Sequence, residues 1–376
     1  MSLGLGEWST AESLLVAAVA AKTAAFGPDA GELVYTYANL GTLRNDRDRS
    51  GAAIEALSAA LGVGVRAFGA EHPLVLLVRG NLGMALIKQR RFHDAGAALL
   101  AVRAGALARP DPDRVSLAFA EQQLGWLALE RRRPAEARDH LRAAEALQTA
   151  AGDRLAIADI AELQAQLAES DGDCEAALRH HERARSALTG LVPPEHPRWK
   201  ELQISRADLE VGCDRHAEAL AVATQLLTTL AVDDPKSALL RAEALERQAT
   251  AHHALGHHAD AVRAAAAALE LLTAAVAEEN PRLAMTLALL ATCEAAAGRP
   301  QQALEHNQRA DQIYTDHSDP DLPARALLRF ERARLLADVR PDEASTLAAA
   351  ALVVLRGAGD GFHRDAAALA SWLAQR

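Results

Sequence analysis

The 376-residue sequence predicts an all-α protein in which about eight helical hairpins stack into a solenoid, with one further helix at each end. Half of the residues are hydrophobic but only 3% are aromatic, and alanine supplies much of the apolar share. Alanine, leucine, glutamate and arginine favour helices, whereas the alternating Val, Ile, Thr and Tyr runs that strands favour are absent. An internal period of about 42 residues then indicates a repeat architecture rather than two or three globular domains.

The period is first visible in a short motif. Asn39-Leu40-Gly41 recurs as Asn81-Leu82-Gly83 and as Gln123-Leu124-Gly125, with 42 residues between successive copies. In later repeats alanine takes the place of the glycine, at Ala165, Ala207, Ala249 and Ala291. Small residues at this position predict a close approach of the two helices in each hairpin, because the side chains at the contact set the distance between helix axes.

We use the word column for one position of the repeat followed through successive repeats. A second column is the residue that follows each hairpin turn. Its members are Trp8, Ser50, Phe92, Pro134, Cys174, His216, His258, Pro300 and Pro341. An alanine follows three residues later in every repeat, from Ala11 to Ala344, and composition alone does not place alanine at one phase nine times. Each repeat is therefore predicted to consist of helix A, a tight turn, helix B and a linker, with proline in most linkers opening the next helix A.

The same phase orders the elements along the chain. Residues 9–25 are predicted to form a helix B without its helix A, residues 32–360 carry the repeats, and residues 361–376 form a C-terminal capping helix. In the second repeat we expect helix A over about 74–89 and helix B over about 93–108. We expect one solenoid over residues 1–376. We interpret the unpaired first helix as the mark of a fragment of a longer protein, with a natural N-terminal cap as the alternative.

These motifs resemble the tetratricopeptide-repeat family, in the 42-residue form typical of kinesin light chains. The resemblance rests on the Asn-Leu-Gly motif, the turn-exit and alanine columns, and the Glu-His-Pro linkers at 71–73 and 195–197, and it covers nearly the whole chain. It implies a right-handed superhelical solenoid of antiparallel helix pairs, with helix A of each pair lining a concave groove. It also implies a scaffold for protein–protein interaction, with the groove as the site of peptide binding.

Composition excludes several classes of function. The sequence has 40 Lys and Arg against 50 Asp and Glu, a net charge of −10, which argues against nucleic acid as a partner. No apolar run approaches the ~20 residues of a membrane span, and the short run 14–21 is not a signal peptide. The three cysteines lack CxxC spacing, so we expect no disulfide framework and a reducing, cytoplasmic location.

No catalytic motif is present, so we predict that this span is not an enzyme and needs no cofactor. The strongest cluster of potential metal ligands is His252, His253, His257 and His258, at the end of one helix A and its turn. Adjacent histidines on a helix point in different directions, and a metal ion needs three or four converging ligands. We therefore predict no metal site and interpret these histidines as a polar turn, although the sequence leaves metal binding by the cluster open.

Basic residues gather at the turns between helices A and B of the early repeats. They are Lys88, Arg90, Arg91, Arg131, Arg132 and Arg133, after an earlier group at Arg44, Arg47 and Arg49. Since equivalent turns stack in a solenoid, these residues predict a positive edge on an acidic protein. The edge either keeps the surface soluble or binds an acidic or phosphorylated segment.

The predicted groove carries a row of side-chain amides in the same three repeats. Asn39, Asn81 and Gln123 precede the Leu-Gly step and could hold the backbone of an extended peptide. Tyr35, Leu77 and Phe119 are expected to form apolar pockets beside them, whereas Asp159, Glu201 and Glu243 make the later groove acidic. The alternative is that the amides satisfy only nearby backbone or water.

We therefore expect a scaffold that binds an extended, acidic peptide or a protein partner in its concave groove, as the recruiting or sensing arm of a larger bacterial signalling protein. Two alternatives remain open: a regulatory sensor for a small peptide or metabolite, and a structural module that self-associates through its N-terminal helix. We expect neither nucleic acid nor a membrane as a partner.

Overall fold

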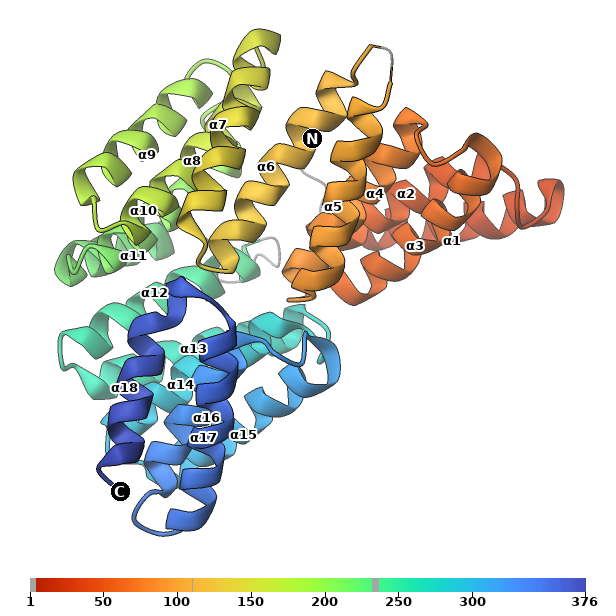
Figure 1. Ribbon diagram of the computed structural model, residues 1–376. Helices are drawn as coiled ribbons and strands as arrows, with labels where there is room; N and C mark the ends of the chain where they lie inside the picture. Colours follow the sequence, from red (N-terminus) through yellow and green to blue (C-terminus); the bar gives the residue numbers. More distant parts are fainter. Residues whose placement is uncertain (1–4, 110, 232–236) are drawn as a thin grey trace. The chain divides into compact units, whose positions relative to one another are not determined.

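The computed structural model describes residues 5–109, 111–231 and 237–376, and this part of the chain contains helices and no strand. Successive helices pair into antiparallel hairpins along the chain (Figure 1). The helices are α1 (Leu5–Phe26), α2 (Glu32–Asp46), α3 (Ser50–Phe68), α4 (Pro73–Lys88), α5 (Phe92–Leu107), α6 (Arg114–Glu130), α7 (Pro134–Ala151), α8 (Arg154–Ser170), α9 (Cys174–Leu188), α10 (Arg198–Gly212), α11 (His216–Thr229), α12 (Ala238–Ala254), α13 (His258–Ala275), α14 (Pro281–Ala296), α15 (Pro300–His317), α16 (Pro323–Leu336), α17 (Pro341–Gly357) and α18 (His363–Ala374), with a 3-10 turn at Asp360–Phe362 before α18.

The helices fall into two compact units. The first unit holds the chain up to residue 127 together with residues 137–153, and so contains α1 to α5 and most of α6 and α7. The second unit holds residues 128–136 and 154–376, and so contains α8 to α18. Within each unit, a helix A packs on its own helix B, and both contact helix A of the next hairpin.

Every helix B after α1 begins at the residue that the turn-exit column predicts, from Ser50 of α3 to Pro341 of α17. Two residues earlier the backbone is left-handed in all but the last of these turns. The left-handed residues are Asp48, Arg90, Arg132, Gly172, Asp214, Gly256 and Gly298, with φ between 50° and 81°. One left-handed residue ends helix A and reverses the chain, which explains why the turn recurs at a fixed phase.

The predicted close crossing of helices A and B is confirmed. A Cβ atom added to Gly41, Gly83 or Gly125 would lie 2.5–2.8 Å from the side chain of a buried leucine on the partner helix. Those leucines are Leu57, Leu99 and Leu141, which form a further column of the repeat. The alanine column from Ala53 to Ala344 is fully buried in all eight hairpins, so these small side chains form the seam of each helix pair.

Two expectations about the chain need correction. The helix α1 begins at Leu5 rather than at residue 9, ahead of the predicted turn at Trp8. The expectation that all cysteines are reduced is wrong for Cys174 and Cys213, whose sulfur atoms are bonded, with Cα atoms 5.8 Å apart. This pair could not be predicted from the sequence separation of 39, because the first residue of α9 meets the residue that follows α10 only once the hairpins stack. Cys293 is a buried free thiol.

Among the described residues, one helix has the length and composition of a membrane span. It is α3, with a mean hydropathy of 1.3. In the structure Leu57, Ala53 and Ala60 of this helix are fully buried in the hairpin seam, and 33% of its apolar stretch is buried.

Candidate functional site

The six residues predicted to line the groove lie at equivalent positions of α2, α4 and α6, all in the first unit. Each helix carries a large side chain followed four residues later by an amide, as in Tyr35 and Asn39 of α2. Residues four apart share one face of a helix, so each pair presents an apolar group and an amide side by side.

The large side chains differ in their surroundings. Tyr35 and Leu77 are 61% and 50% exposed. Phe119 is half-buried and its ring lies against Gly80 of α4, where an added Cβ atom would approach the ring to 2.7 Å. Phe119 therefore fills the contact between α4 and α6, and the open apolar surface comes from Tyr35 and Leu77.

The amides become more buried from α2 to α6. Asn39 is exposed, and Asn81 is half-buried, with its Nδ2 atom 3.4 Å from the Thr42 hydroxyl of α2. Gln123 is 6% exposed, and its Oε1 atom accepts no hydrogen bond from the part of the chain that the structure describes. A buried acceptor without a donor is costly, so this atom is a candidate for contact with a ligand N–H group.

The turn cations of the first unit are engaged by local groups. Lys88 donates to Asp48 Oδ1 and to the carbonyl oxygen of Asn45, both at 3.0 Å. Arg91 donates to Asp94 at 2.9 Å, and the guanidinium of Arg90 lies 5.7 Å from the centre of the Phe92 ring. The predicted positive edge therefore has less net charge than its sequence indicates.

Arg131, Arg132 and Arg133 belong to the second unit, where they form the turn between α6 and α7. Arg133 donates to Glu136 at 3.1 Å. Burial and the neighbouring charge of Arg133 lower the pKa of Arg131. Arg132 is the left-handed residue of this turn, so its place in the repeat is also a backbone requirement.

The acidic residues of the later repeats form ion pairs with arginines that the sequence analysis did not predict as site residues. Arg198, the first residue of α10, forms ion pairs with Asp159 and Glu162 of α8 and with Glu201 of its own helix. Arg282 of α14 pairs with Glu243 of α12 at 3.0 Å. The expected acidic groove is therefore a chain of ion pairs that joins successive helices A.

Burial shapes the electrostatics of this chain of ion pairs. Burial raises the pKa of Glu162, against the opposing charge of Arg198 and the hydrogen bond from Ser205. Burial also disfavours the charge on Arg247, but the carboxylates of Asp208 and Glu246 outweigh it and hold the pKa of this guanidinium above its usual value. These ion pairs consequently hold neighbouring repeats together.

The histidine cluster separates into two pairs. The Nδ1 atoms of His252 and His257 lie 3.3 Å apart, and the rings of His253 and His258 are 6.1 Å apart. Among the described residues, no three of these histidines converge on one point.

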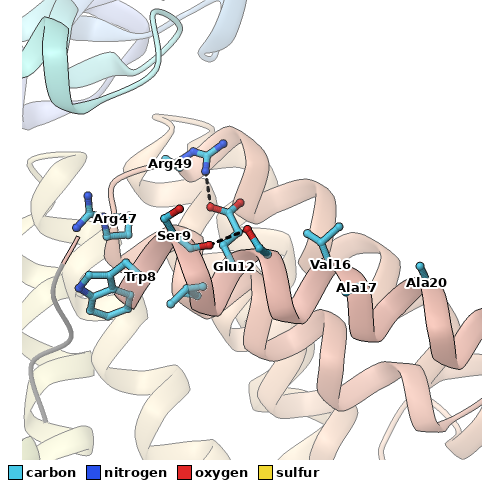
Figure 2. A pocket seen from close by; sticks show the side chains of 10 residues that line it. Trp8, Ser9, Glu12, Val16, Ala17, Ala20, Arg47 and Arg49 are labelled. Atoms are coloured by element: carbon cyan, nitrogen blue, oxygen red, sulfur yellow. Dashed lines mark hydrogen bonds and ion pairs between the residues drawn. The ribbon is translucent and has the colours of Figure 1, made fainter. Parts of the chain in front are cut away.

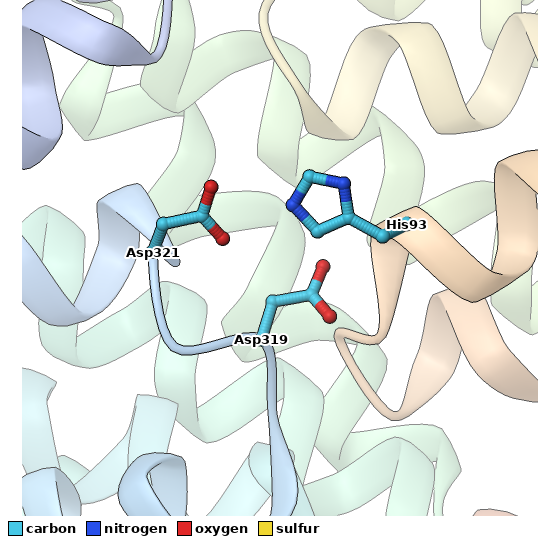
Figure 3. Close-up of side chains that lie close together, drawn as sticks. All are labelled: His93, Asp319 and Asp321. Atoms are coloured by element: carbon cyan, nitrogen blue, oxygen red, sulfur yellow. The ribbon is translucent and has the colours of Figure 1, made fainter.

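Figure 3 shows two further carboxylates, Asp319 and Asp321, on the loop between α15 and α16. They belong to the second unit, whereas His93, also drawn there, belongs to the first. We therefore assign no metal site to these residues.

A second open surface lies along α1. Trp8, Glu12 and Val16 of α1 and the turn residues Arg47 and Arg49 line a cavity of about 660 Å³ (Figure 2). Glu12 pairs with Arg49 at 2.6 Å, and the Arg47 guanidinium lies 5.9 Å from the Trp8 ring centre. Leu14 and Val16 are exposed large hydrophobic residues, so α1 presents an apolar surface to solvent.

No protein-family profile and no curated protein matches the sequence. By structure, the chain is similar to a Rap protein complexed with competence and sporulation factor. The TM-score is 0.58 at 13% identity, and the match covers 92% of this chain and 99% of the Rap chain. A putative kinesin light chain from Podosopora anserina with TPR-like repeats has a TM-score of 0.41 at 21% identity, over 52% of this chain and 92% of its own. A STAND protein with a tetratricopeptide repeat sensor, from Pyrococcus horikoshii, has a TM-score of 0.48 at 13% identity, over 80% of this chain and 46% of its own.

The Rap match carries the conclusion about the fold, because it alone of these three exceeds a TM-score of 0.5. The predicted fold class, an all-α solenoid of antiparallel helix pairs, is confirmed.

Proposed function

We propose that this chain, a tetratricopeptide-repeat protein by its fold, binds an extended peptide along α2, α4 and α6 and acts as a non-catalytic scaffold in a larger regulatory protein. The observation that carries the proposal is the pair of exposed side chains Tyr35 and Leu77, each four residues before an amide on consecutive helices A. Exposed apolar groups beside polar groups are typical of peptide-binding surfaces, in which main-chain hydrogen bonds supply affinity and pockets supply specificity.

The amides supply the hydrogen bonds in this proposal. Asn39 and Asn81 offer both donors and acceptors to a peptide backbone, and the unpaired Oε1 atom of Gln123 accepts from a peptide N–H group. Tyr35 and Leu77 contact alternate side chains of the peptide, with Phe119 as the wall between α4 and α6. The Rap protein of the structural match is complexed with a factor, which supports the binding of a partner as a use of this fold.

The proposed charge preference is for acidic segments. Arg90 faces the Phe92 ring, and Lys88 and Arg91 lie on either side of it in sequence. Charged groups at the rim of an interface mainly accelerate association and lose their effect at high salt. We therefore propose that this edge steers an acidic peptide, and that Arg131, Arg132 and Arg133 contribute in the same way.

The test starts from a displayed peptide library selected on the intact protein. For a selected peptide, we expect Asn81→Ala to weaken binding by about 0.5–1.5 kcal/mol, the net value of one hydrogen bond. Ser205→Ala is the matched control, since Ser205 occupies the same position of the repeat in the second unit. Reversal of charge at Arg90 and Arg91 should slow association at low salt and have little effect at high salt. Selected peptides whose affinity depends on Ser205 but not on Asn81 would refute the proposal.

A second candidate function is self-association through α1. The exposed residues Leu14 and Val16 and the cavity beside Trp8 favour it. In this alternative a second copy of the chain covers α1, and peptide binding is secondary.

A further inference from the structure

An apolar cavity of about 320 Å³ opens between α14, α15 and α16 in the second unit. Its walls include Met285 and Leu289 of α14 and Leu327 and Leu328 of α16, while Asn307 of α15 also lines it. The volume is at the lower end of the range of ~300–1,000 Å³ that is usual for small-molecule sites.

Asn307, which lines this cavity, carries one unpaired acceptor. The residue is 1% exposed, and its Nδ2 atom donates to the carbonyl oxygen of Leu328 at 2.9 Å. A carbonyl oxygen only accepts, so this contact fixes which side of the amide carries the nitrogen. The Oδ1 atom then remains without a hydrogen-bond donor among the described residues. A buried acceptor in this state destabilises the fold, and a ligand that brings a donor removes that cost.

The position of the cavity in the repeat explains its apolar character. Met285 and Leu289 occupy the places that Glu243 and Arg247 hold in α12 and that Glu201 and Ser205 hold in α10. The chain of ion pairs between helices A therefore gives way to apolar side chains at α14. The charged residue that lines the cavity, Glu331, pairs with Arg334 at 3.1 Å, so a ligand has no unbalanced charge to neutralise.

We propose that this cavity binds a small neutral molecule with an apolar, ring-sized body and a single N–H or O–H group, which donates to Oδ1 of Asn307. A purely apolar ligand would leave this oxygen unpaired, and a charged ligand would lose its hydration among Met285, Leu289 and Leu327. The site is separate from the proposed peptide surface, since all of its residues belong to the second unit.

Indole and N-methylindole are the probes that test the proposal, because they have nearly the same shape and only indole has a donor. Binding to the intact protein is measured by ligand-observed NMR titration. We expect saturable binding of both, with indole tighter by about fivefold to tenfold, the equivalent of one net hydrogen bond. Asn307→Leu should remove this difference between the probes. Ala288→Phe, which fills the cavity from a half-exposed position, should abolish the binding of both.

Two controls separate this result from misfolding and from the peptide surface. Ala296→Phe places the same ring at an exposed residue of α14 outside the cavity and should leave indole binding unchanged, as should Asn81→Ala in the first unit. The proposal is overturned if indole does not saturate the protein, if the two probes bind equally, or if Ala288→Phe has no effect. It is also overturned if N-acetyltryptophanamide binds more tightly than indole, because the occupant would then be a side chain of a partner peptide.

Discussion

At the scale of single residues, the structure gives several charged side chains a role that composition did not reveal. Arg90 and Arg132 were interpreted through their charge, but both have a left-handed backbone at the same point of the repeat where other turns carry Gly172, Gly256 or Gly298. The column of small residues in helix A and the alanine column in helix B were predictable, because the same kind of residue recurs at the same position of each repeat. The unpaired acceptors of Gln123 and Asn307 were not predictable, since a missing partner is a property of the packed neighbourhood.

A buried histidine provides a test at this scale. Burial and the nearby charge of Arg206 lower the pKa of His181 to about 4. The folded protein therefore favours neutral His181, whereas the unfolded chain takes up a proton near the usual pKa of 6.5. The contribution of neutral His181 to the free energy of unfolding is fully present above about pH 6.5. It decreases as the pH falls towards about 4, by up to about 3 kcal/mol.

Urea unfolding as a function of pH measures this loss, and His181→Leu provides the comparison. The variant should lose less stability than the native chain over that pH range. Parallel curves for the two proteins would mean that His181 is protonated equally easily in the folded and unfolded states.

At the scale of elements, contacts between neighbouring repeats recur at a fixed separation. Arg198 and Asp159, Arg247 and Asp208, and Cys174 and Cys213 are each 39 residues apart. Asn81 and Thr42 have the same separation. The separation of 39 residues is 3 residues shorter than the 42-residue period. The two members of each pair therefore occupy different positions of the repeat. Residues at the same position of every repeat predicted the helices and the seam of each helix pair. The contacts between repeats join different positions, so they could be found only by comparing one position with another.

The turn between helices A and B supplies a prediction at this scale. Gly256 has φ 77° with no atom within 4 Å of an added Cβ, so Gly256→Ala should cost only the backbone penalty, about 1 kcal/mol. Arg90 has φ 60°, and Arg90→Gly should stabilise the chain by up to about 1 kcal/mol. Thermal melts of the two variants should therefore shift in opposite directions. A loss of stability in Arg90→Gly would show that the contact of Arg90 with Phe92 outweighs the strain of the turn.

The disulfide supplies a second prediction for neighbouring hairpins. A link that closes 39 residues should stabilise the chain by about 2–4 kcal/mol, which a reductant removes. Cys293 is buried and its pKa is raised to about 11 by burial and by Glu294, so it should resist alkylation in the folded protein.

Mass spectrometry after alkylation tests this pairing. We expect no labelling of the native protein before reduction, and labelling of Cys174 and Cys213 alone after mild reduction. Cys213→Ser should unfold at the same urea concentration with and without reductant. Labelling of Cys174 and Cys213 without any reductant would contradict the link, and would agree with the reducing compartment expected from the sequence.

At the scale of the whole molecule, different parts of the chain carry surfaces of different chemical character. The first unit carries exposed apolar groups beside amides, and the second carries ion pairs between helices A and an apolar cavity between α14, α15 and α16. The exposed apolar residues of α1 form a further surface. Fold class followed from the repeat alone, whereas the assignment of surfaces needed the burial of each side chain.

Self-association is the prediction that belongs to the whole chain. If α1 is a contact surface between copies, light scattering should show a mass that rises with protein concentration. Leu14→Gln together with Val16→Gln should restore the monomer, because both side chains are exposed and contribute little to the fold. Leu100→Gln is the control, at an exposed leucine of α5. A monomer at every concentration would exclude α1 as a self-association surface.

Photo-crosslinking to a selected peptide tests the central claim most directly. A photoreactive phenylalanine analogue replaces either Leu77 of α4 or Leu100 of α5, which are 50% and 53% exposed in adjacent helices of one hairpin. Binding along α2, α4 and α6 predicts a crosslink from position 77, its loss on competition with unlabelled peptide, and none from position 100. A competed crosslink from position 100, with none from position 77, would contradict the account.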